Sequence, residues 1–302
     1  MNIDDIKNFS KNIEGNIYFD YEIKKLNWFN IGGNVKIFFK PSSLEELINF
    51  LRIYNNRGKI FLLGAGSNVL FSDELFEGVV IKLGRRFSNI SQLNESTLIA
   101  GSAALDKKIS DYSKDNNIGG MEFLSCIPGT IGGGIKMNSG CYNQEIKNII
   151  LSVQTVDFKG NVITIPSQQI KFYYRGTNIP KDLIFLSATL KGYKNDKNII
   201  NEKMLDLKNK KEKTQPSKIK TSGSTFKNPD NKQNLKVWEL IKNSVPPNTH
   251  FGDAYISEHH SNFFVNKKNA SSSDMMCLIE FVKKEVKKKY NIKLELEIVI
   301  IN

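Results

Sequence analysis

The chain has 302 residues, of which 40% are hydrophobic and 25% charged, and its formal net charge is +12. These values are ordinary for a globular protein and exclude a disordered, collagen-like or fibrous chain. The length exceeds what one small hydrophobic core needs, so we expect two or three subdomains.

The three cysteines, Cys126, Cys141 and Cys277, exclude a disulfide framework and have no zinc-ligand spacing. The positive charge would suit nucleic acid, an anionic membrane or a phosphorylated small molecule, and its sign does not choose among them. The densest lysine runs, 208–220 and 283–289, are most simply solvated faces. No apolar run approaches the roughly 20 residues that cross a bilayer, and no signal peptide is visible, so we expect a cytoplasmic protein.

From Lys36 onward the pattern predicts strands alternating with a helix, after a first dozen residues that resemble a disordered tail. The stretch 36–41 is extended, and Ser43 followed by Glu46 forms a capping-box pattern that opens a helix. The run 59–64 is a strand that ends in glycine and leads through a loop, 64–68, into further strands. A Rossmann fingerprint turns a strand directly into a helix, so this loop is not one.

Both glycine-rich segments could lie against a ligand. In the first, Ser67 and Asn68 add short polar side chains and backbone amides that could wrap a phosphate. The second, 127–134, combines glycines with a proline and fits poorly in a helix or a central strand, so we predict a bent backbone. Apolar residues such as Phe123 and Ile131 alternate with these glycines, which favours a ligand-lining segment over a surface loop.

The second half of the chain contains a predicted hairpin over 149–165 and a strand over 183–192. A Lys- and Asn-rich helix follows, and we place a domain boundary near residue 195. A short helix is expected at 237–242. A longer helix follows 271–273, with apolar residues at the spacing of a core face.

Few familiar catalytic patterns occur. The sequence has no P-loop, no H-E-x-x-H and no G-x-S-x-G, which weakens hydrolase interpretations. His259 and His260 are adjacent and would point in different directions, so we expect no metal there. Taken alone, Arg175 is an ordinary ion-pair residue, and Glu295 and Glu297 would share one face of a strand at a solvent-facing edge.

Eight segments stand out together and in one order. They are FNIGG (29–33), LLGAGSNVL (62–70), GMEFLSCIPGTIGGGIKMNSGCY (120–142), YYRGT (173–177), TQP (214–216), GSTFKNP (223–229), SEHHSNFFVN (257–266) and LELEI (294–298). In this combination they resemble the UDP-N-acetylenolpyruvoylglucosamine reductase (MurB) family of bacterial peptidoglycan synthesis, in its shorter subtype. Asn30, Thr177, Ile298 and the segment 244–254 depart from the family pattern, and none of them removes a proposed catalytic group.

The resemblance implies an α+β chain. It comprises an FAD-binding fold of the vanillyl-alcohol-oxidase (PCMH) type, with two subdomains, and a C-terminal α/β substrate-binding domain. The implied division is an N-terminal extension at 1–19, an FAD-binding domain at 20–195 with its inner boundary near residue 84, and a substrate-binding domain at 196–302 whose last strand returns toward the active site. A monomer without nucleic-acid or membrane partners is implied as well.

The resemblance also implies non-covalent FAD and NADPH as the co-substrate that reduces it. The residues implied to hold FAD are Gly64, Ala65, Gly66, Ser67, Asn68, Pro128, Gly129, Thr130, Gly132, Gly133 and Gly140. Glycine at such positions would let the main chain approach the pyrophosphate closely.

The implied reaction reduces UDP-N-acetyl-enolpyruvoylglucosamine to UDP-N-acetylmuramate. Arg175 would bind and polarise the enolpyruvyl carboxylate, Ser224 would deliver a proton, and Glu297 would hold the enol form or orient Arg175. The implied substrate contacts are Tyr174, Lys227 and Asn228.

Two alternatives stay open at this point. An FAD-dependent oxidoreductase of the same superfamily with another substrate would need different residues at 175, 224 and 297. A basic nucleic-acid-binding protein would need aromatic residues interleaved with Lys and Arg, and we find no RNP, helix-turn-helix or KH signature.

Overall fold

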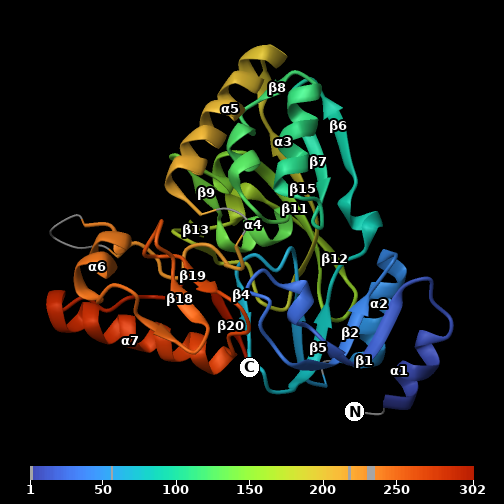
Figure 1. Cartoon of the computed structure of the whole chain (residues 1–302). Coiled ribbons are helices and arrows are strands. Elements are labelled where there is room, and N and C mark those ends of the chain that lie inside the picture. The colour runs from blue at the N-terminus through green and yellow to red at the C-terminus, as the bar shows by residue number, and fades with distance from the viewer. Residues whose placement is uncertain (1–2, 56, 217–218, 230–234) are drawn as a thin grey trace. The chain divides into compact units, whose positions relative to one another are not determined.

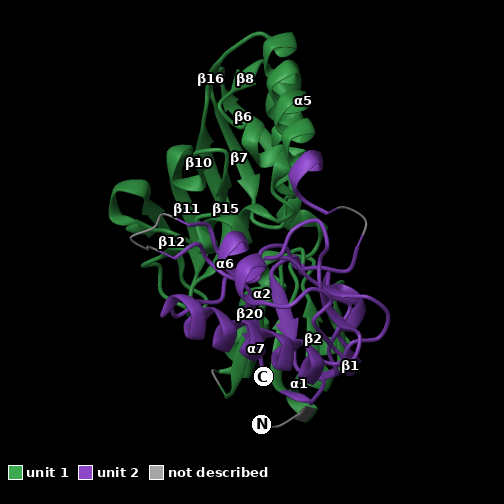
Figure 2. Ribbon diagram, turned by 60° about the vertical axis from the view of Figure 1, so that its left-hand side comes forward, with its two compact units in different colours: residues 1–19, 37–65, 77–211 green, residues 20–36, 66–76, 212–302 purple. Residues whose placement is uncertain are grey.

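A computed structural model describes residues 3–55, 57–216, 219–229 and 235–302. The chain divides into two compact units (Figure 2). Unit 1 comprises residues 1–19, 37–65 and 77–211, and unit 2 comprises 20–36, 66–76 and 212–302. Within the described ranges, none of the helices has both the length and the apolar character needed to cross a membrane.

A four-stranded sheet, most of it in unit 1, is covered by two N-terminal helices (Figure 1). In sheet order its strands are β1 (Asn16–Glu22), β2 (Asn34–Lys40), β5 (Phe76–Ile81) and β3 (Lys59–Leu62), and the helices are α1 (Ile3–Ser10) and α2 (Leu44–Tyr54). The Ser43 Oγ accepts the Glu46 N–H at 3.2 Å, so α2 begins as predicted. The Glu46 carboxylate accepts the N–H groups of Ser42, Glu14 and Gly15. These bonds tie the segment around residues 14–15 to the first turn of α2.

The prediction of a disordered tail over the first dozen residues was wrong, because residues 3–10 form α1. Ile6 is 1% exposed and belongs to a core shared with Phe39 and Phe50, whose rings stack at 4.3 Å between centroids. The burial of one helix face supplies the ordering energy that a short polar helix lacks by itself.

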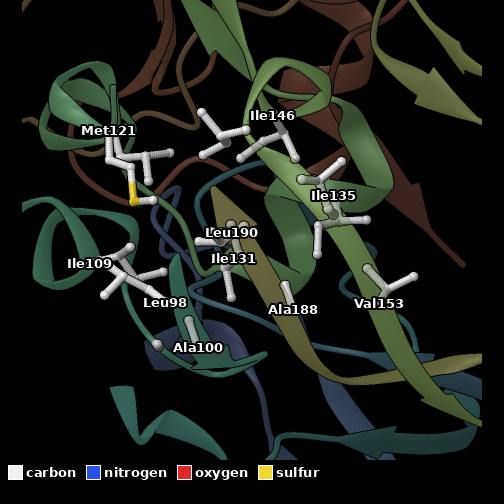
Figure 3. Close-up of a cluster of buried hydrophobic side chains, with 14 of the residues drawn as sticks. Leu98, Ala100, Ile109, Met121, Ile131, Ile135, Ile146, Val153, Ala188 and Leu190 are labelled. Carbon is white, nitrogen blue, oxygen red and sulfur yellow. The ribbon is translucent and has the colours of Figure 1, made fainter. Parts of the chain in front are cut away.

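The second layer of unit 1 is an antiparallel sheet of order β12-β11-β15-β7-β6. Its strands are β6 (Ile90–Asn94), β7 (Thr97–Gly101), β11 (Ile150–Val156), β12 (Val162–Pro166) and β15 (Ile184–Lys191), and the helices of this layer are α3 (Asp106–Asp115), α4 (Ile131–Met137) and α5 (Lys197–Thr214). The predicted hairpin is confirmed, with Val156 opposite Val162. The helix α4 packs on β7 and β15, and Figure 3 shows its Ile131 and Ile135 beside Leu190 and Ala188.

The helix α4 corrects our prediction that 127–134 avoids helical structure. Thr130 caps it, with its Oγ1 accepting the Gly133 N–H, and Ile131 and Ile135 are completely buried one turn apart. Each glycine in a helix costs about 1 kcal/mol relative to alanine, whereas full burial of an isoleucine stabilises by about 1.5–3 kcal/mol. Packing therefore outweighs local propensity.

Short elements connect these layers. The strands are β8 (Ile118–Gly119), β9 (Gly140–Cys141), β10 (Gln144–Glu145), β13 (Phe172–Tyr173), β14 (Gly176–Thr177) and β16 (Tyr193–Lys194). The 3-10 helices are η1 (Lys24–Leu26), η2 (Arg85–Ser88), η3 (Glu122–Cys126), η4 (Ile146–Asn148) and η5 (Ser167–Gln169).

Unit 2 has its own core between two helices and a small antiparallel sheet. The elements are α6 (Val237–Ser244), α7 (Ser272–Tyr290), the sheet β17 (His250–Phe251), β18 (Ala254–Ile256) and β19 (Phe264–Asn266), and the parallel pair β4 (Val69–Phe71) and β20 (Val299–Ile301). Ser271 caps α7 through a reciprocal pair of hydrogen bonds with Asp274. The predicted core face of α7 is confirmed: Met275, Ile279, Val282 and Val286 are fully buried.

Candidate active site

Within unit 1, parts of the two predicted glycine loops lie together. A Cβ atom placed on Gly64 would stand 2.6 Å from the Thr130 Oγ1. The Gly64 carbonyl also accepts a hydrogen bond from the Lys82 Nζ, and burial, aided by the nearby Lys40 charge, lowers the pKa of Lys82. The sequence analysis did not single out Lys82. The one local indication of a special role is that this lysine directly follows the apolar strand β5.

Gly133 is the exposed glycine of the second glycine loop. The N–H groups of Gly129, Ile131, Gly132 and Gly134 all donate to protein carbonyl oxygens, at 2.8–3.1 Å. By contrast, the Gly133 N–H has the Thr130 Oγ1 at a long 3.4 Å, and a Cβ there would meet its nearest atom at 3.6 Å. An exposed main-chain amide beside a hydroxyl fits a phosphate oxygen.

At Gly132 and Gly140, packing within the protein itself leaves no room for a side chain. A Cβ at Gly132 would lie 3.0 Å from the Ser102 carbonyl oxygen, and one at Gly140 would lie 2.1 Å from the Gln144 carbonyl oxygen. These glycines therefore permit close backbone packing whether or not a ligand is bound.

Asp106, in the first turn of α3, is a buried acid that sequence reasoning missed. Both carboxyl oxygens are buried and have no hydrogen-bond partner among the described residues. One of them, Oδ2, lies 2.9 Å from where a Cβ of Gly129 would stand. Burial raises the pKa of Asp106 to about 8, so the carboxyl is mostly protonated at neutral pH. No sequence signal marks it, because an acid in a first helical turn is ordinary.

Arg175 occupies a tight turn between β13 and β14. Tyr173 pairs with Gly176, which leaves Tyr174 and Arg175 as the two loop residues, and Arg175 has a positive φ of 59°. Its Cζ lies 4.9 Å from the centre of the Tyr174 ring, and its Nη2 lies 3.5 Å from the Gly140 carbonyl oxygen. The structure thus brings together three of the predicted site residues.

Asn138 positions this turn. It is fully buried, and its Nδ2 donates to the Tyr173 carbonyl oxygen at 3.0 Å and to the Glu145 carboxylate at 3.1 Å. The Asn138 Oδ1 accepts the Lys147 N–H. We did not assign it a role, although it lies inside the quoted segment 120–142.

Within unit 2, the predicted residues Ser224, Glu297 and Asn68 come from segments that pair through the backbone. Ser224 bridges Phe263, and the next residue, Thr225, accepts the Glu297 N–H at 2.9 Å. The Asn68 Nδ2 donates to the Glu297 carbonyl oxygen at 3.0 Å. Segments far apart in the sequence are thereby joined around Glu297.

The expectation that Glu295 and Glu297 lie in one strand was wrong. The strand β20 begins only at Val299, and before it the segment makes an isolated bridge between Leu296 and Phe226. Glu295 is exposed and approaches Lys227 at 3.5 Å, whereas Glu297 is half-buried. Residues 295–297 do not form a regular strand, because the segment that they pair with, 224–227, is not a strand itself and contributes only isolated bridges.

The predicted substrate contacts in unit 2 also have structural partners. The Lys227 N–H donates to the Glu295 carbonyl oxygen at 2.9 Å, and the Asn228 Oδ1 accepts the Val237 N–H at 3.1 Å, next to the start of α6. Arg175 and Tyr174 belong to unit 1, and the other proposed catalytic and substrate-binding residues belong to unit 2. No cluster of potential metal ligands occurs in the part of the chain that the structure describes.

Comparisons with known proteins agree along the whole chain. Residues 35–166 match the FAD binding domain family, and residues 215–301 match the UDP-N-acetylenolpyruvoylglucosamine reductase C-terminal domain family. The chain is 57% identical over 301 residues to the UDP-N-acetylenolpyruvoylglucosamine reductase of Pelagibacter ubique (strain HTCC1062), covering 100% of both chains. It is 43% identical over 286 residues to that of Rickettsia conorii, covering 95% of this chain and 96% of the relative.

A solved structure supports the same assignment. The crystal structure of UDP-N-acetylenolpyruvylglucosamine reductase (MurB) from Thermus caldophilus aligns with a TM-score of 0.82 and 25% identity, over 96% of this chain and 100% of that chain. Together with the two family matches and the full-length relatives, this shows that the chain belongs to the UDP-N-acetylenolpyruvoylglucosamine reductase (MurB) family.

Proposed function

We propose that this protein reduces UDP-N-acetyl-enolpyruvoylglucosamine to UDP-N-acetylmuramate, with NADPH as reductant, in the synthesis of peptidoglycan precursors. The observation that carries the proposal is the 57% identity to a UDP-N-acetylenolpyruvoylglucosamine reductase over the whole length of both chains. From the resemblance of the segments that contain them, we assign Arg175, Ser224 and Glu297 to catalysis. When bound, FAD would accept hydride from NADPH and pass it to the terminal alkene carbon of the enolpyruvyl ether. We assign residues 20–195 to FAD binding and residues 196–302 to substrate binding.

We assign the FAD pyrophosphate to the two glycine loops. The exposed Gly133 supports this assignment, because its main-chain amide has no side chain of its own to keep a phosphate oxygen away. We also assign the remaining residues of the two glycine loops, including Gly66 and Pro128, to FAD binding, as the resemblance implies.

Arg175 would hold the enolpyruvyl carboxylate. Its guanidinium is permanently charged and can bind a carboxylate with two parallel hydrogen bonds. The two-residue turn and the Tyr174 ring limit the conformations of the arginine before substrate arrives, which lowers the entropic cost of binding. Asn138 would act on Arg175 indirectly, by holding the Tyr173 carbonyl.

Ser224 would protonate the carbon next to the one that accepts hydride. A serine hydroxyl is a weak acid, so the serine oxygen must recover a proton promptly, from Lys227 or an ordered water. Glu297 would hold the enol form or orient the substrate carboxyl group, while Lys227, Asn228 and Tyr174 would contact the UDP-sugar. The protein would work as a monomer in the cytoplasm.

The test measures the two half-reactions separately in the Ser224→Ala variant. NADPH should bleach the visible flavin absorbance at the wild-type rate, while turnover with the UDP-sugar should fall about 10²–10⁴-fold, because only the second half-reaction needs the proton donor. The matched control is Ser222→Ala, which loses a buried hydroxyl that donates to the Val69 carbonyl oxygen. The control should lose about 1 kcal/mol of stability and keep its turnover.

Two outcomes would contradict the assignment. Equal slowing of both half-reactions in Ser224→Ala would remove its role as proton donor. A purified protein that is colourless and takes up no FAD, or whose reduced flavin is not reoxidised by the UDP-sugar, would instead favour the alternative of another substrate or of no flavin chemistry.

A further inference from the structure

Two of the three cysteines form a pair in unit 1. Cys126 ends η3 and Cys141 ends β9, and these two elements pack against each other. The Cys141 thiol donates to the carbonyl oxygen of Phe123, a residue of η3, at 3.4 Å, and the Cys126 and Cys141 thiols influence each other's pKa. Both residues are free thiols, Cys126 buried and Cys141 half-buried, whereas Cys277 is exposed on α7 in unit 2.

The surroundings of the pair favour a thiolate on Cys126. The neighbouring Cys141 thiol lowers the pKa of the Cys126 thiol, against the raising effect of burial, and the Ser125 hydroxyl and the Lys211 charge lower it further. The same interaction raises the pKa of Cys141. The Lys211 Nζ is held in place at 2.7 Å from the Cys126 carbonyl oxygen, and the Ser125 Oγ lies 3.8 Å from the Cys126 Sγ. One thiol is therefore poised to react and the other to resolve.

We propose that Cys126 and Cys141 form a redox modification site, at which a hydroperoxide converts the two thiols to a disulfide. The packing of η3 on β9, with the Cys141 thiol 3.4 Å from the Phe123 carbonyl of η3, carries this inference, because a bridge between cysteines on packed segments needs little movement of the backbone. Reactive and resolving thiols placed side by side are also the arrangement found in redox-sensing proteins.

The chemistry balances with hydrogen peroxide as the oxidant. The Cys126 thiolate attacks one peroxide oxygen, the O–O bond breaks, and hydroxide leaves and is protonated to water, giving a sulfenic acid. The Cys141 sulfur then attacks the sulfenic sulfur, the S–O bond breaks, and a second water leaves with the Cys141 proton. The two sulfurs lose two electrons in total, and the peroxide gains them.

The disulfide would affect the proposed active site through Gly140. Gly140 immediately precedes Cys141, and its carbonyl oxygen lies 3.5 Å from the Arg175 Nη2. A covalent link at Cys141 restrains β9 and hence the carbonyl that Arg175 contacts. The effect on turnover rests on the proposed function, whereas formation of the disulfide does not.

The first experiment measures the modification itself. FAD-loaded Cys277→Ser protein is treated with hydrogen peroxide, and its remaining free thiols are alkylated. The mass of the intact protein is then measured by mass spectrometry. Both thiols should become inaccessible together, with the mass of two hydrogen atoms lost, and a dithiol reductant should restore them. Separate oxidation of each thiol with added oxygen, or two thiols that still alkylate in full, would overturn the proposal.

A variant of the second cysteine sharpens the result. Cys141→Ala should slow the oxidation of Cys126 by roughly three- to tenfold at neutral pH, since a raised pKa lowers the thiolate fraction more than it raises thiolate reactivity. It should also accumulate sulfenic acid, for lack of a resolving thiol. Oxidation of Cys126 at the same rate in this variant would exclude the assigned role of Cys141.

Activity is measured afterwards, once peroxide has been removed. The oxidised Cys277→Ser protein should lose most of its UDP-sugar turnover and regain it with the dithiol, while Cys126→Ala should keep its turnover under the same treatment. A disulfide that forms without changing turnover would overturn the link to Arg175 alone. No turnover in any untreated sample would count against the proposed function and leave the thiol chemistry measurable.

Discussion

Asp106 should make the stability of this protein fall as pH rises across the neutral range. Burial raises the pKa of its carboxyl from 3.8 to about 8, so the folded protein keeps a proton that the unfolded chain releases. A raised folded-state pKa gives a contribution that is fully present below pH 3.8 and lost as pH rises toward about 8.

The magnitude follows from proton linkage. Between pH 5 and pH 7 the folded state binds nearly one more proton than the unfolded state, and each pH unit then changes the free energy of unfolding by about 1.36 kcal/mol. Relative to Asp106→Asn, which cannot ionise, the wild type should therefore lose about 2–3 kcal/mol of stability over this interval. Both proteins are unfolded with urea at a series of pH values and one free FAD concentration.

A matched control lies on the same helix. Asp115 is exposed and its pKa is lowered, chiefly by the hydrogen bond from Lys197, so it is already ionised in both states above pH 5. Asp115→Asn should show the same pH slope as the wild type. If the difference between wild type and Asp106→Asn were independent of pH, the Asp106 carboxyl would be ionised in the folded protein and our account of its burial would be refuted.

Two further predictions concern the glycine loop and the N-terminal helix. Gly133→Ala should fold at least as stably as the wild type, because alanine is the better helix former and meets no close protein atom, yet bind FAD about 10–100-fold more weakly in fluorescence titrations of the apoprotein. Gly176→Ala, also without close contacts, is its control, and equal FAD affinities would exclude a phosphate at Gly133. Ile6→Ala should lower the free energy of unfolding in urea by about 2–5 kcal/mol, whereas the exposed Lys7→Ala should change it by less than about 0.5 kcal/mol. An Ile6→Ala value as small as that of Lys7→Ala would show that α1 is not anchored to the core.

Much of the fold could be predicted because its signals are local. A cap residue such as Ser43 or Ser271 forms its hydrogen bonds within one turn of the helix that it starts. The periodic core face of α7 and the hairpin around 159–161 likewise depend on neighbours in the sequence. Family membership was accessible for another reason, since eight segments in one order are far more specific than any single motif.

The candidate site could be predicted only in part. The sequence named Arg175 and Gly140, and the structure brings them within 3.5 Å, but Asn138 and Lys82 act through contacts with distant segments that no local pattern shows. The strand expected at Glu295 and Glu297 does not form for a similar reason. Strand pairing depends on a distant partner segment, which here contributes only isolated bridges.

By itself, then, the sequence determined the family, the starts of several helices, one strand pair and the residue types available for chemistry. Only the tertiary structure decided that glycines 132–134 lie in a helix, that residues 3–10 are ordered, that Asp106 holds a proton and that the elements carrying Cys126 and Cys141 pack together. The physical reason is common to all four: burial and pairing energies between residues far apart in the chain exceed the roughly 1 kcal/mol preferences that local sequence expresses.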